Sequence, residues 1–513
     1  TTYDSNLLKM VFINYIQLDF ISVFCELFLF ISSIVLLMFG VFFVSLRDYK
    51  YVNFVREFQY MIVFVLIIGA LLIWTSPITN LIVFNSLLSI DSLVINVKLL
   101  LLLITICCLL VSFNYLKKEK FNLFEYNILI LMSIIGLLCF ISANDLISFY
   151  LALELQSLCF YILATFNKDS AFSTEAGLKY FILGALSSGF LLFGISLIYG
   201  ATGTTNFETL AKAIYFFDFN VSSMDEIGLR IVLGSLFILM SLFFKLTAAP
   251  FHLWAPDVYE GAPTPVSLLF AAVPKLGIFI ILIKLFFILF YDFISFWQDE
   301  IIFCSLLSIL IGTFSALRQV KIKRFLALSS VTHVGFLLIA FATGTLEGLS
   351  SLLFYMVIYI LMTVNAWSIL LFLEYKQPGK RLRYISDFQN LSKSHPLLAF
   401  TLSINLFSMA GVPPLAGFFS KMLIFFVGLE SSLNFIVIVG IILSVVSAFY
   451  YVRFIKIIYF DGITQGFYFQ TTQEYNTAYI IGFTFLVIFF LFINPNLLLL
   501  FTKSLAINLF SSI

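Results

Sequence analysis

The sequence predicts an all-α membrane protein with about 14 transmembrane helices, and three observations support this fold class. First, 62% of the 513 residues are hydrophobic and only 11% are charged, whereas soluble domains are about 25% charged. Second, apolar runs of about 20 residues, the length that crosses the hydrocarbon core of a bilayer, recur along the whole chain. Third, Lys and Arg concentrate in alternate connections between these runs, as in polytopic membrane proteins.

We predict crossings at 20–46, 58–79, 95–116, 122–143, 145–167, 173–200, 226–250, 263–291, 299–318, 323–344, 346–375, 397–428, 431–458 and 477–502. The connections between these crossings are short. The longest of them, 201–225, holds little charge. We therefore expect one polytopic membrane domain over residues 1–513.

The positions of Lys and Arg agree with this count of crossings. Connections after odd-numbered crossings hold 19 of the 28 Lys and Arg residues. Six lie on the opposite side, helix ends included: Lys9, Lys98, Lys212, Arg230, Lys284 and Lys503. By the positive-inside rule, both termini are expected on the intermembrane-space or periplasmic side. The remaining three cations, Lys245, Lys275 and Lys421, lie inside crossings.

The composition argues against other protein classes. The net charge of +1 and the lack of a basic–aromatic stripe predict no nucleic-acid partner. The cysteines form no CxxC pair or Cys/His cluster, so we expect small buried side chains rather than an iron–sulfur or zinc site: Cys25, Cys107, Cys108, Cys139, Cys159 and Cys304. The N-terminal residues show no signal-peptide or transit pattern, so insertion is expected to be directed by the helices.

The stretch Ser241–Lys284 contains two apolar runs, and each of them carries a lysine, Lys245 in the first and Lys275 in the second. A charge at mid-bilayer costs about 2.5–3.5 kcal/mol on insertion scales. Pro250 lacks a backbone donor and should interrupt the helix just after Lys245, and an interrupted helix is tolerated only where it lines protein or water. Lys275 lies about 18 Å along its crossing, out of reach of either end. Both lysines are predicted to exchange protons; for Lys245 the alternative is snorkelling from a helix end.

Glu154 lies in the fifth crossing, about 13.5 Å from its start at Asp145, near the middle of the membrane. A nearby lysine would keep such a carboxylate ionised. We infer that Glu154 pairs with Lys245. The alternative is a carboxylate that is tied structurally to a neighbouring helix.

His333 and Lys421 repeat this arrangement in the second half of the chain. His333 lies in the tenth crossing among hydroxyl residues, and its imidazole suits a proton relay; a packing role is the alternative. Lys421 follows Pro413 and Pro414, which should break the twelfth crossing. Glu154 and Lys245 are 91 positions apart, and His333 and Lys421 are 88 apart. Equivalent broken segments in two halves are typical of transporters with internal repeats.

Five further titratable residues are predicted to be structural. Glu26 is expected at the rim of the first crossing. Asp257 and Glu260 are expected to fix the loop after the seventh crossing, and His252 and His395 lie near crossing ends.

Four segments resemble the antiporter-like membrane subunits of respiratory complex I: KLTAAPFHLWAPDVYEGAPTPVS, VPKLG, SSVTHVGFLL and FSMAGVPPLAGFFSK. The resemblance covers roughly residues 20–502. It implies fourteen helices with two inverted five-helix repeats, 122–291 and 299–458, in which helices 7 and 12 are broken. It also implies that the proton-translocating residues are Glu154, Lys245, Lys275, His333 and Lys421.

The resemblance further implies that this chain binds no cofactor or metal itself. NADH, FMN, iron–sulfur clusters and ubiquinone would belong to other parts of the complex. The implied partners are other membrane-arm subunits, including neighbouring antiporter-like subunits, and membrane lipid, with cardiolipin as a candidate. The abundant Phe, Ile, Leu and Tyr are typical of an organelle-encoded protein of the mitochondrial inner membrane; a bacterial plasma membrane is the alternative.

Three functions are compatible with these features. The leading hypothesis is a proton-translocating subunit of NADH:ubiquinone (quinone) oxidoreductase, without a redox site of its own. The second is a stand-alone cation/proton antiporter. The third is a structural subunit with an inactive axis, which the costly buried charges argue against.

Overall fold

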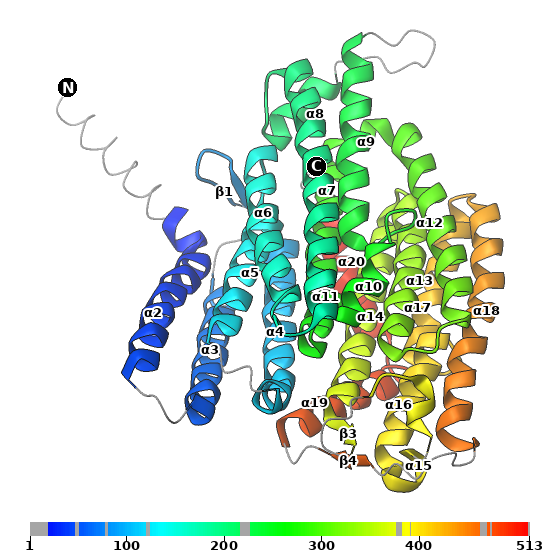
Figure 1. Cartoon of the computed structure of the whole chain (residues 1–513). Coiled ribbons are helices and arrows are strands. Elements are labelled where there is room, and N and C mark those ends of the chain that lie inside the picture. The colour runs from blue at the N-terminus through cyan, green and yellow to red at the C-terminus, as the bar shows by residue number, and fades with distance from the viewer. Residues whose placement is uncertain are drawn as a thin grey trace.

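The structure, a computed structural model, describes residues 19–46, 51–76, 81–119, 124–215, 226–375, 382–389, 391–461, 469–471 and 475–510. Over these residues the chain forms a bundle of roughly aligned helices (Figure 1). Lys9 and several of the loop cations lie outside the described residues: Arg47, Lys50, Lys120, Lys376, Lys380 and Arg381.

Within the described residues, twelve helices are long and apolar enough to cross a membrane. They are α2 (Phe24–Leu46), α3 (Tyr51–Trp74), α4 (Ser92–Lys118), α5 (Glu125–Ser142), α6 (Leu146–Ala164), α7 (Ala171–Thr202), α9 (Glu226–Leu246), α11 (Thr264–Ile283), α12 (Ile294–Leu317), α13 (Ile322–Ala342), α14 (Leu346–Phe372) and α18 (Asn434–Tyr459). The predicted all-α membrane fold is confirmed.

Shorter elements complete the described chain. The helices are α8 (Phe207–Tyr215), α10 (Trp254–Gly261), α15 (Leu391–Ser394), α16 (Pro396–Ala410), α17 (Ala416–Glu430), α19 (Tyr475–Phe490) and α20 (Asn496–Phe510), with the π-helix η1 (Lys284–Leu289) and the 3-10 helices η2 (Tyr291–Phe293) and η3 (Ile385–Phe388). Strand β1 (Leu81–Val83) pairs antiparallel with β2 (Leu88–Ile90), and β3 (Leu373–Tyr375) pairs with β4 (Phe469–Thr471).

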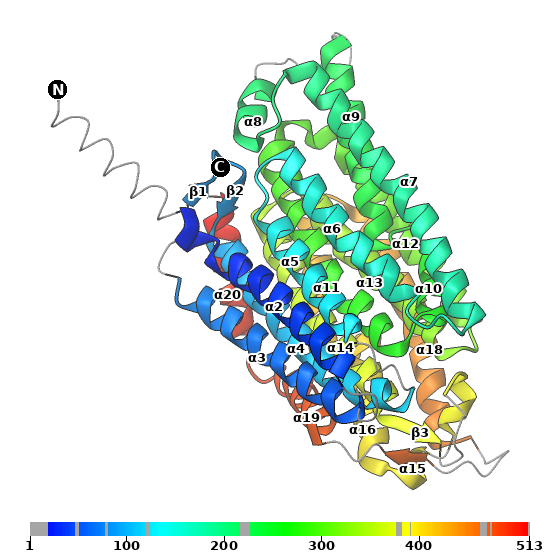
Figure 2. The same cartoon turned by 60° about the vertical axis from the view of Figure 1, so that its left-hand side comes forward.

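Helices α11, α13 and α14 form the centre of the bundle. The apolar stretches of α11 and α13 are 100% buried and that of α14 is 89% buried, whereas those of α2 and α7 are only 33% buried. Since apolar side chains on the outer helices face lipid rather than water, their exposure carries no penalty in a membrane. Figure 2 shows α2 and α3 side by side at one edge of the bundle, with α7 and α9 along another.

The two predicted helix breaks are present. Helix α9 ends at Leu246, Thr247 adopts a positive φ of 66°, and α10 begins at Trp254. Helix α16 ends at Ala410, Gly411 adopts a φ of 86°, and α17 begins at Ala416. Prolines occupy both gaps, where they cannot donate to a helical carbonyl.

Two predicted segments differ from the structure. The last crossing, 477–502, is not one helix: α19 ends at Phe490 and α20 begins at Asn496, because Asn494-Pro495 interrupts the helical hydrogen bonding between them. The predicted loop around Asp257 and Glu260 is the short helix α10.

Close packing at the second break depends on glycine. A Cβ on Gly417 would lie 1.9 Å from the carbonyl oxygen of Ser408, so α17 could not keep its place against α16. Gly417→Ala should therefore destabilise the protein by about 1–3 kcal/mol, measured as a lower thermal unfolding midpoint. Gly189→Ala, also helical but with nothing within 4 Å of its Cβ, is the matched control. Equal midpoints for the two variants would contradict this packing.

Candidate functional site

Lys245 lies in the last turn of α9, where the helix breaks. Its Nζ donates a hydrogen bond to the Tyr161 hydroxyl on α6 at 3.1 Å and lies 5.4 Å from the centre of that ring. The side chain is only partly buried. The helix break therefore holds an ammonium group inside the bundle, against the aromatic face of a neighbouring helix.

Glu154 lies on the same helix as Tyr161. Ser157 donates to Glu154 Oε2 at 3.3 Å, while the buried Oε1 accepts no hydrogen bond from a described residue. Glu154, Ser157 and Tyr161 follow the i, i+3, i+7 spacing of one helix face. The charge of Glu154 acts on Lys245.

The predicted pairing of Glu154 with Lys245 is electrostatic and not a direct ion pair in this structure. Both side chains are described, and their charged atoms do not come within 4.0 Å. Lys245 instead donates its hydrogen bond to Tyr161, seven residues beyond Glu154 along α6. Gly184 leaves room for this tyrosine, since a Cβ there would lie 2.1 Å from the Tyr161 hydroxyl.

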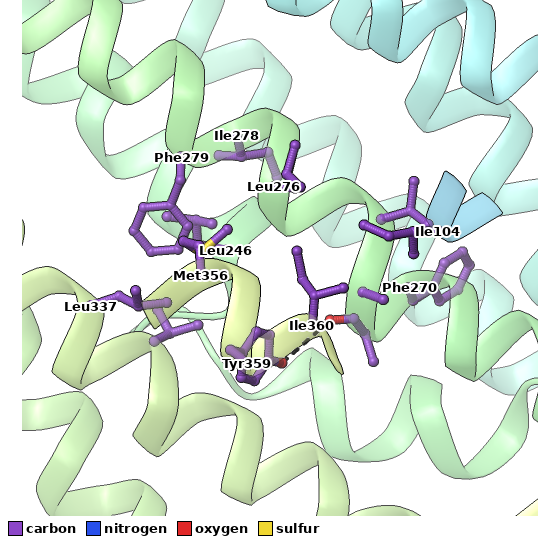
Figure 3. Packing of buried hydrophobic residues seen from close by; sticks show 14 of the residues in the cluster. Ile104, Leu246, Phe270, Leu276, Ile278, Phe279, Leu337, Met356, Tyr359 and Ile360 are labelled. Carbon is purple, nitrogen blue, oxygen red and sulfur yellow. Dashed lines mark hydrogen bonds between the residues drawn. The ribbon is translucent and has the colours of Figure 1, made fainter. Parts of the chain in front are cut away.

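Lys275 lies at the centre of the bundle, in α11, with 1% of its surface exposed. Its Nζ donates to the Tyr359 hydroxyl on α14 at 3.0 Å, and that hydroxyl donates in turn to the Ala271 carbonyl at 3.3 Å. Figure 3 shows the hydrogen bond from the Tyr359 hydroxyl to the Ala271 carbonyl as a dashed line, among apolar side chains that include Met356 and Ile360. Snorkelling to a membrane surface is excluded for this lysine.

His333 lies on α13 beside the same tyrosine, with ring centres 5.6 Å apart. Its Nδ1 is 2.6 Å from the Tyr355 hydroxyl and its Nε2 is 3.1 Å from the Tyr451 hydroxyl. A neutral imidazole donates through one nitrogen and accepts through the other, so this ring can take part in both hydrogen bonds. The charges of Lys275 and Lys421 both act on it.

Lys421 lies in α17, directly after the second break. Its Nζ donates to the carbonyl oxygens of Met409 and Ala410, both at 2.9 Å. These carbonyls end α16 and have no partner within that helix. Nζ also lies 5.1 Å from the Phe336 ring, one turn from His333 on α13. Lys421, the lysine at the second broken helix, is therefore held by the C-terminal end of α16.

The five predicted site residues thus fall into three groups. Glu154 and Lys245 interact electrostatically at α6, the helix that carries Tyr161, Lys275 and His333 both adjoin Tyr359, and Lys421 binds the end of α16. Direct hydrogen bonds between protein groups do not connect one group to the next among the described residues. The sequence did not single out these tyrosines, because the chain contains 24 of them.

The residues predicted to be structural lie near these groups or around the broken helix. The carboxylate of Asp257, on α10, forms ion pairs with Lys179 of α7 at 3.0 Å and with Arg324 of α13 at 2.9 Å. Glu260 pairs with Arg324 and Lys321. These contacts fix the half-helix α10 between α7 and α13. His252 is buried in the break, with no partner for its Nδ1 among the described residues, and His395 precedes α16.

Three charged residues that were expected at the rim or at helix ends are buried between helices. Glu26, Lys98 and Lys284 are only 5%, 4% and 2% exposed. Their exposure was predicted from their distance to the helix ends, but neighbouring helices cover their side chains. The signal available in the sequence was that Lys98 is followed by five leucines, a run typical of a buried helix.

Two other expectations concern cysteine and metal. All six cysteines are free thiols, buried or partly buried. No group of three or more His, Cys, Asp or Glu side chains suited to holding a metal ion occurs in the part of the chain that the structure describes.

The fold and these groups define a class: a polytopic membrane protein with a lysine held inside the bundle at each of two broken helices, as in ion-translocating membrane subunits. Residues 143–447 match the family model described as NADH:quinone oxidoreductase/Mrp antiporter, TM. The chain belongs to this family.

Similar proteins extend the match over nearly the whole chain. The chain is 45% identical to NADH-ubiquinone oxidoreductase chain 2 of Marchantia polymorpha, over 96% of this chain and 99% of that protein. It is 41% identical to NADH-quinone oxidoreductase subunit N of Paramagnetospirillum magneticum, over 88% and 90%. A chain of respiratory complex I from Thermus thermophilus has a TM-score of 0.74 at 27% identity, over 93% and 98%.

The hydroxyl of Tyr359 accepts a hydrogen bond from Lys275. Tyr359→Phe keeps the ring but leaves this buried ammonium unpaired, which should destabilise the protein by about 1–3 kcal/mol. Thermal unfolding of the assembled protein measures the change. Tyr479→Phe, in a ring that is 73% exposed, should have little effect. If both variants unfold at the same temperature, the Tyr359–Lys275 hydrogen bond contributes nothing.

Proposed function

We propose that this chain is a proton-translocating membrane subunit of NADH:quinone oxidoreductase and that Glu154, Lys245, Lys275, His333 and Lys421 carry the protons. The observation that supports this most directly is the burial of Lys275 at the centre of the bundle, with a tyrosine hydroxyl as its partner. An idle charge there would be costly to maintain. The 45% identity to an oxidoreductase chain supplies the reaction to which proton movement is coupled.

The first step of the proposed cycle is a change in the field at Lys245. The negative charge of Glu154 acts on Lys245, whose ammonium donates to the Tyr161 hydroxyl. When electron transfer elsewhere in the complex draws Glu154 away or neutralises it, that electrostatic interaction is lost and Lys245 releases its proton. Because Lys245 lies at a helix break, its amine is held where polar backbone can support a hydrated path.

The proton is then relayed through the centre. Lys275 and Tyr359 receive it on α11 and α14, and His333, bonded to two tyrosine hydroxyls, passes it toward Lys421. A neutral imidazole can accept a proton at one nitrogen while it gives one up at the other. Lys421 ends the relay, because two helix-end carbonyls stabilise its charged form.

We also propose that residues 122–291 and 299–458 are two inverted five-helix repeats. Each contains a helix that is broken at proline after a residue with positive φ, and each break holds a lysine. Glu154 in the first repeat corresponds to His333 in the second.

The proposed location is the inner membrane of mitochondria, or the plasma membrane if the chain is bacterial. Both termini would face the intermembrane space or periplasm, as the distribution of Lys and Arg predicts. The partners would be other membrane-arm subunits, including antiporter-like ones. The many exposed apolar side chains on α2, α7 and α18 suit contact with such subunits and with lipid, cardiolipin included.

Removing the charge at the first group tests the proposal. Lys245→Met and Glu154→Gln, each in an assembled complex reconstituted in liposomes, should lower the number of protons moved per electron by about half or more, since the coupled release step is lost. Lys503→Met removes an exposed lysine and serves as the control. Unchanged stoichiometry in both site variants would remove the proposal.

The second candidate function is a stand-alone cation/proton antiporter, which the family description includes. The buried lysines alone do not distinguish the two. If the oxidoreductase role is correct, the purified chain alone in liposomes should not exchange Na⁺ or K⁺ for H⁺ above the rate of empty vesicles. Exchange that Lys245→Met abolishes would favour the antiporter.

A further inference from the structure

A second set of buried charges lies outside the three groups described above. Glu26 of α2 and Lys98 of α4 form a direct ion pair, with their side chains only 6% and 5% exposed. Lys284, at the start of the π-helix η1, donates to Ser89 at 2.9 Å and lies 4.0 Å from the Asp91 carboxylate. The charge of Lys98 also acts on Lys284. The four groups therefore form one cluster whose formal charges sum to zero.

A cavity opens onto the Glu26–Lys98 pair. It has a volume of about 300 Å³ and is bounded by α2, the end of α3, β2 and the start of α4. Its polar lining includes Ser22, Thr75 and Ser76, besides Glu26 and Lys98 themselves. A cavity of this size with several polar partners has room for water molecules, so the ion pair can exchange protons with it.

The cluster and the proposed relay share one continuous buried helical segment, α11 followed by η1. Lys275 in α11 and Lys284 at the start of η1 are about 13.5 Å apart along its axis. The α-helix changes to a π-helix at Lys284, and such turns occur frequently at functional sites. A purely structural ion pair explains neither the adjoining cavity nor the second buried lysine.

We propose that Glu26 and Lys98, with Lys284 and Asp91 beside them, form a proton-exchange site between the central relay and the aqueous phase at the end of the bundle where α2 and α4 begin. This inference rests on the proposed function, because it assigns a route to the protons of the same relay. The ligand of the site is the proton, carried by water in the cavity.

The exchange needs no other reactant. A proton that arrives from the relay binds to the carboxylate of Glu26, which becomes neutral. Lys98 then loses the countercharge that stabilised its ammonium form and releases its own proton to the cavity. Transfer of the proton from Glu26 to the neutral amine of Lys98 restores the ion pair. One proton enters and one leaves in each cycle, and the net charge of the cluster returns to zero.

Lys98→Arg separates this role from a structural one. Arginine retains the ion pair with Glu26 but does not release its proton. In the assembled complex in liposomes, we expect Lys98→Arg to lower the protons moved per electron by about half or more, as removal of a general acid does. If the pair is only structural, this variant should pump normally.

A double variant controls for an effect of the size of arginine, which is larger than the lysine it replaces at position 98. Glu26→Gln with Lys98→Met removes both charges and leaves no unpaired ion in the bundle. It should assemble and show the same loss of pumping. The control is Glu226→Gln with Arg230→Gln, which removes an ion pair exposed by 86% and 51%. Normal pumping in either site variant, or failure of both to assemble, would overturn the inference and assign the pair a structural role.

The outcome also separates this inference from the proposed function. If Lys245→Met lowers pumping while Lys98→Arg and the double variant do not, the relay stands and the protons use another route. If Lys245→Met and Glu154→Gln pump normally as well, the relay itself is wrong.

Discussion

The structure depends on how a bundle of apolar helices accommodates lysine side chains far from water. Each central lysine is paired with a neutral, polarisable group rather than a carboxylate: Lys245 and Lys275 with tyrosine hydroxyls, and Lys421 with two backbone carbonyls. An ammonium in direct contact with a carboxylate would be held strongly in its charged form. A hydroxyl or carbonyl partner satisfies the hydrogen bond with much less charge stabilisation, so the proton can leave when the surrounding field changes.

The broken helices provide the carbonyl groups and the space that this arrangement needs. At Gly411 the chain turns away from the axis of α16, and the carbonyls of Met409 and Ala410 become available to Lys421. At Thr247 the same kind of turn places Lys245 against α6. Asp257 and Glu260 hold α10 through pairs with residues of α7 and α13, so the break has a fixed geometry. The buried pair of Glu26 and Lys98 differs, because there a carboxylate does contact the amine, next to a cavity.

The sequence predicted those features that follow from single residues. Proline in an apolar run marks a helix break, which located the interruptions at Pro250 and at Pro413–Pro414. A lysine twelve residues into such a run marks a buried charge, which identified Lys275. The sequence could not predict which helix faces meet, so Tyr161, the hydrogen-bond partner of Lys245, was missed. The break between α19 and α20 was also missed, although Asn494-Pro495 indicates it. The burial of Lys98 and Lys284 was not predicted, because burial by neighbouring helices depends on tertiary packing.

The central claim is that these lysines act by releasing protons, not by carrying a fixed charge. Lys275→Arg tests it most directly, since arginine keeps the positive charge and a donor for Tyr359 but cannot be deprotonated in a protein. The measurement is the ratio of protons moved to electrons transferred by the assembled, reconstituted complex. We expect Lys275→Arg to lower that ratio as much as Lys275→Met does. A wild-type ratio in Lys275→Arg, with a reduced ratio in Lys275→Met, would mean that only the charge matters and would contradict proton release at this lysine.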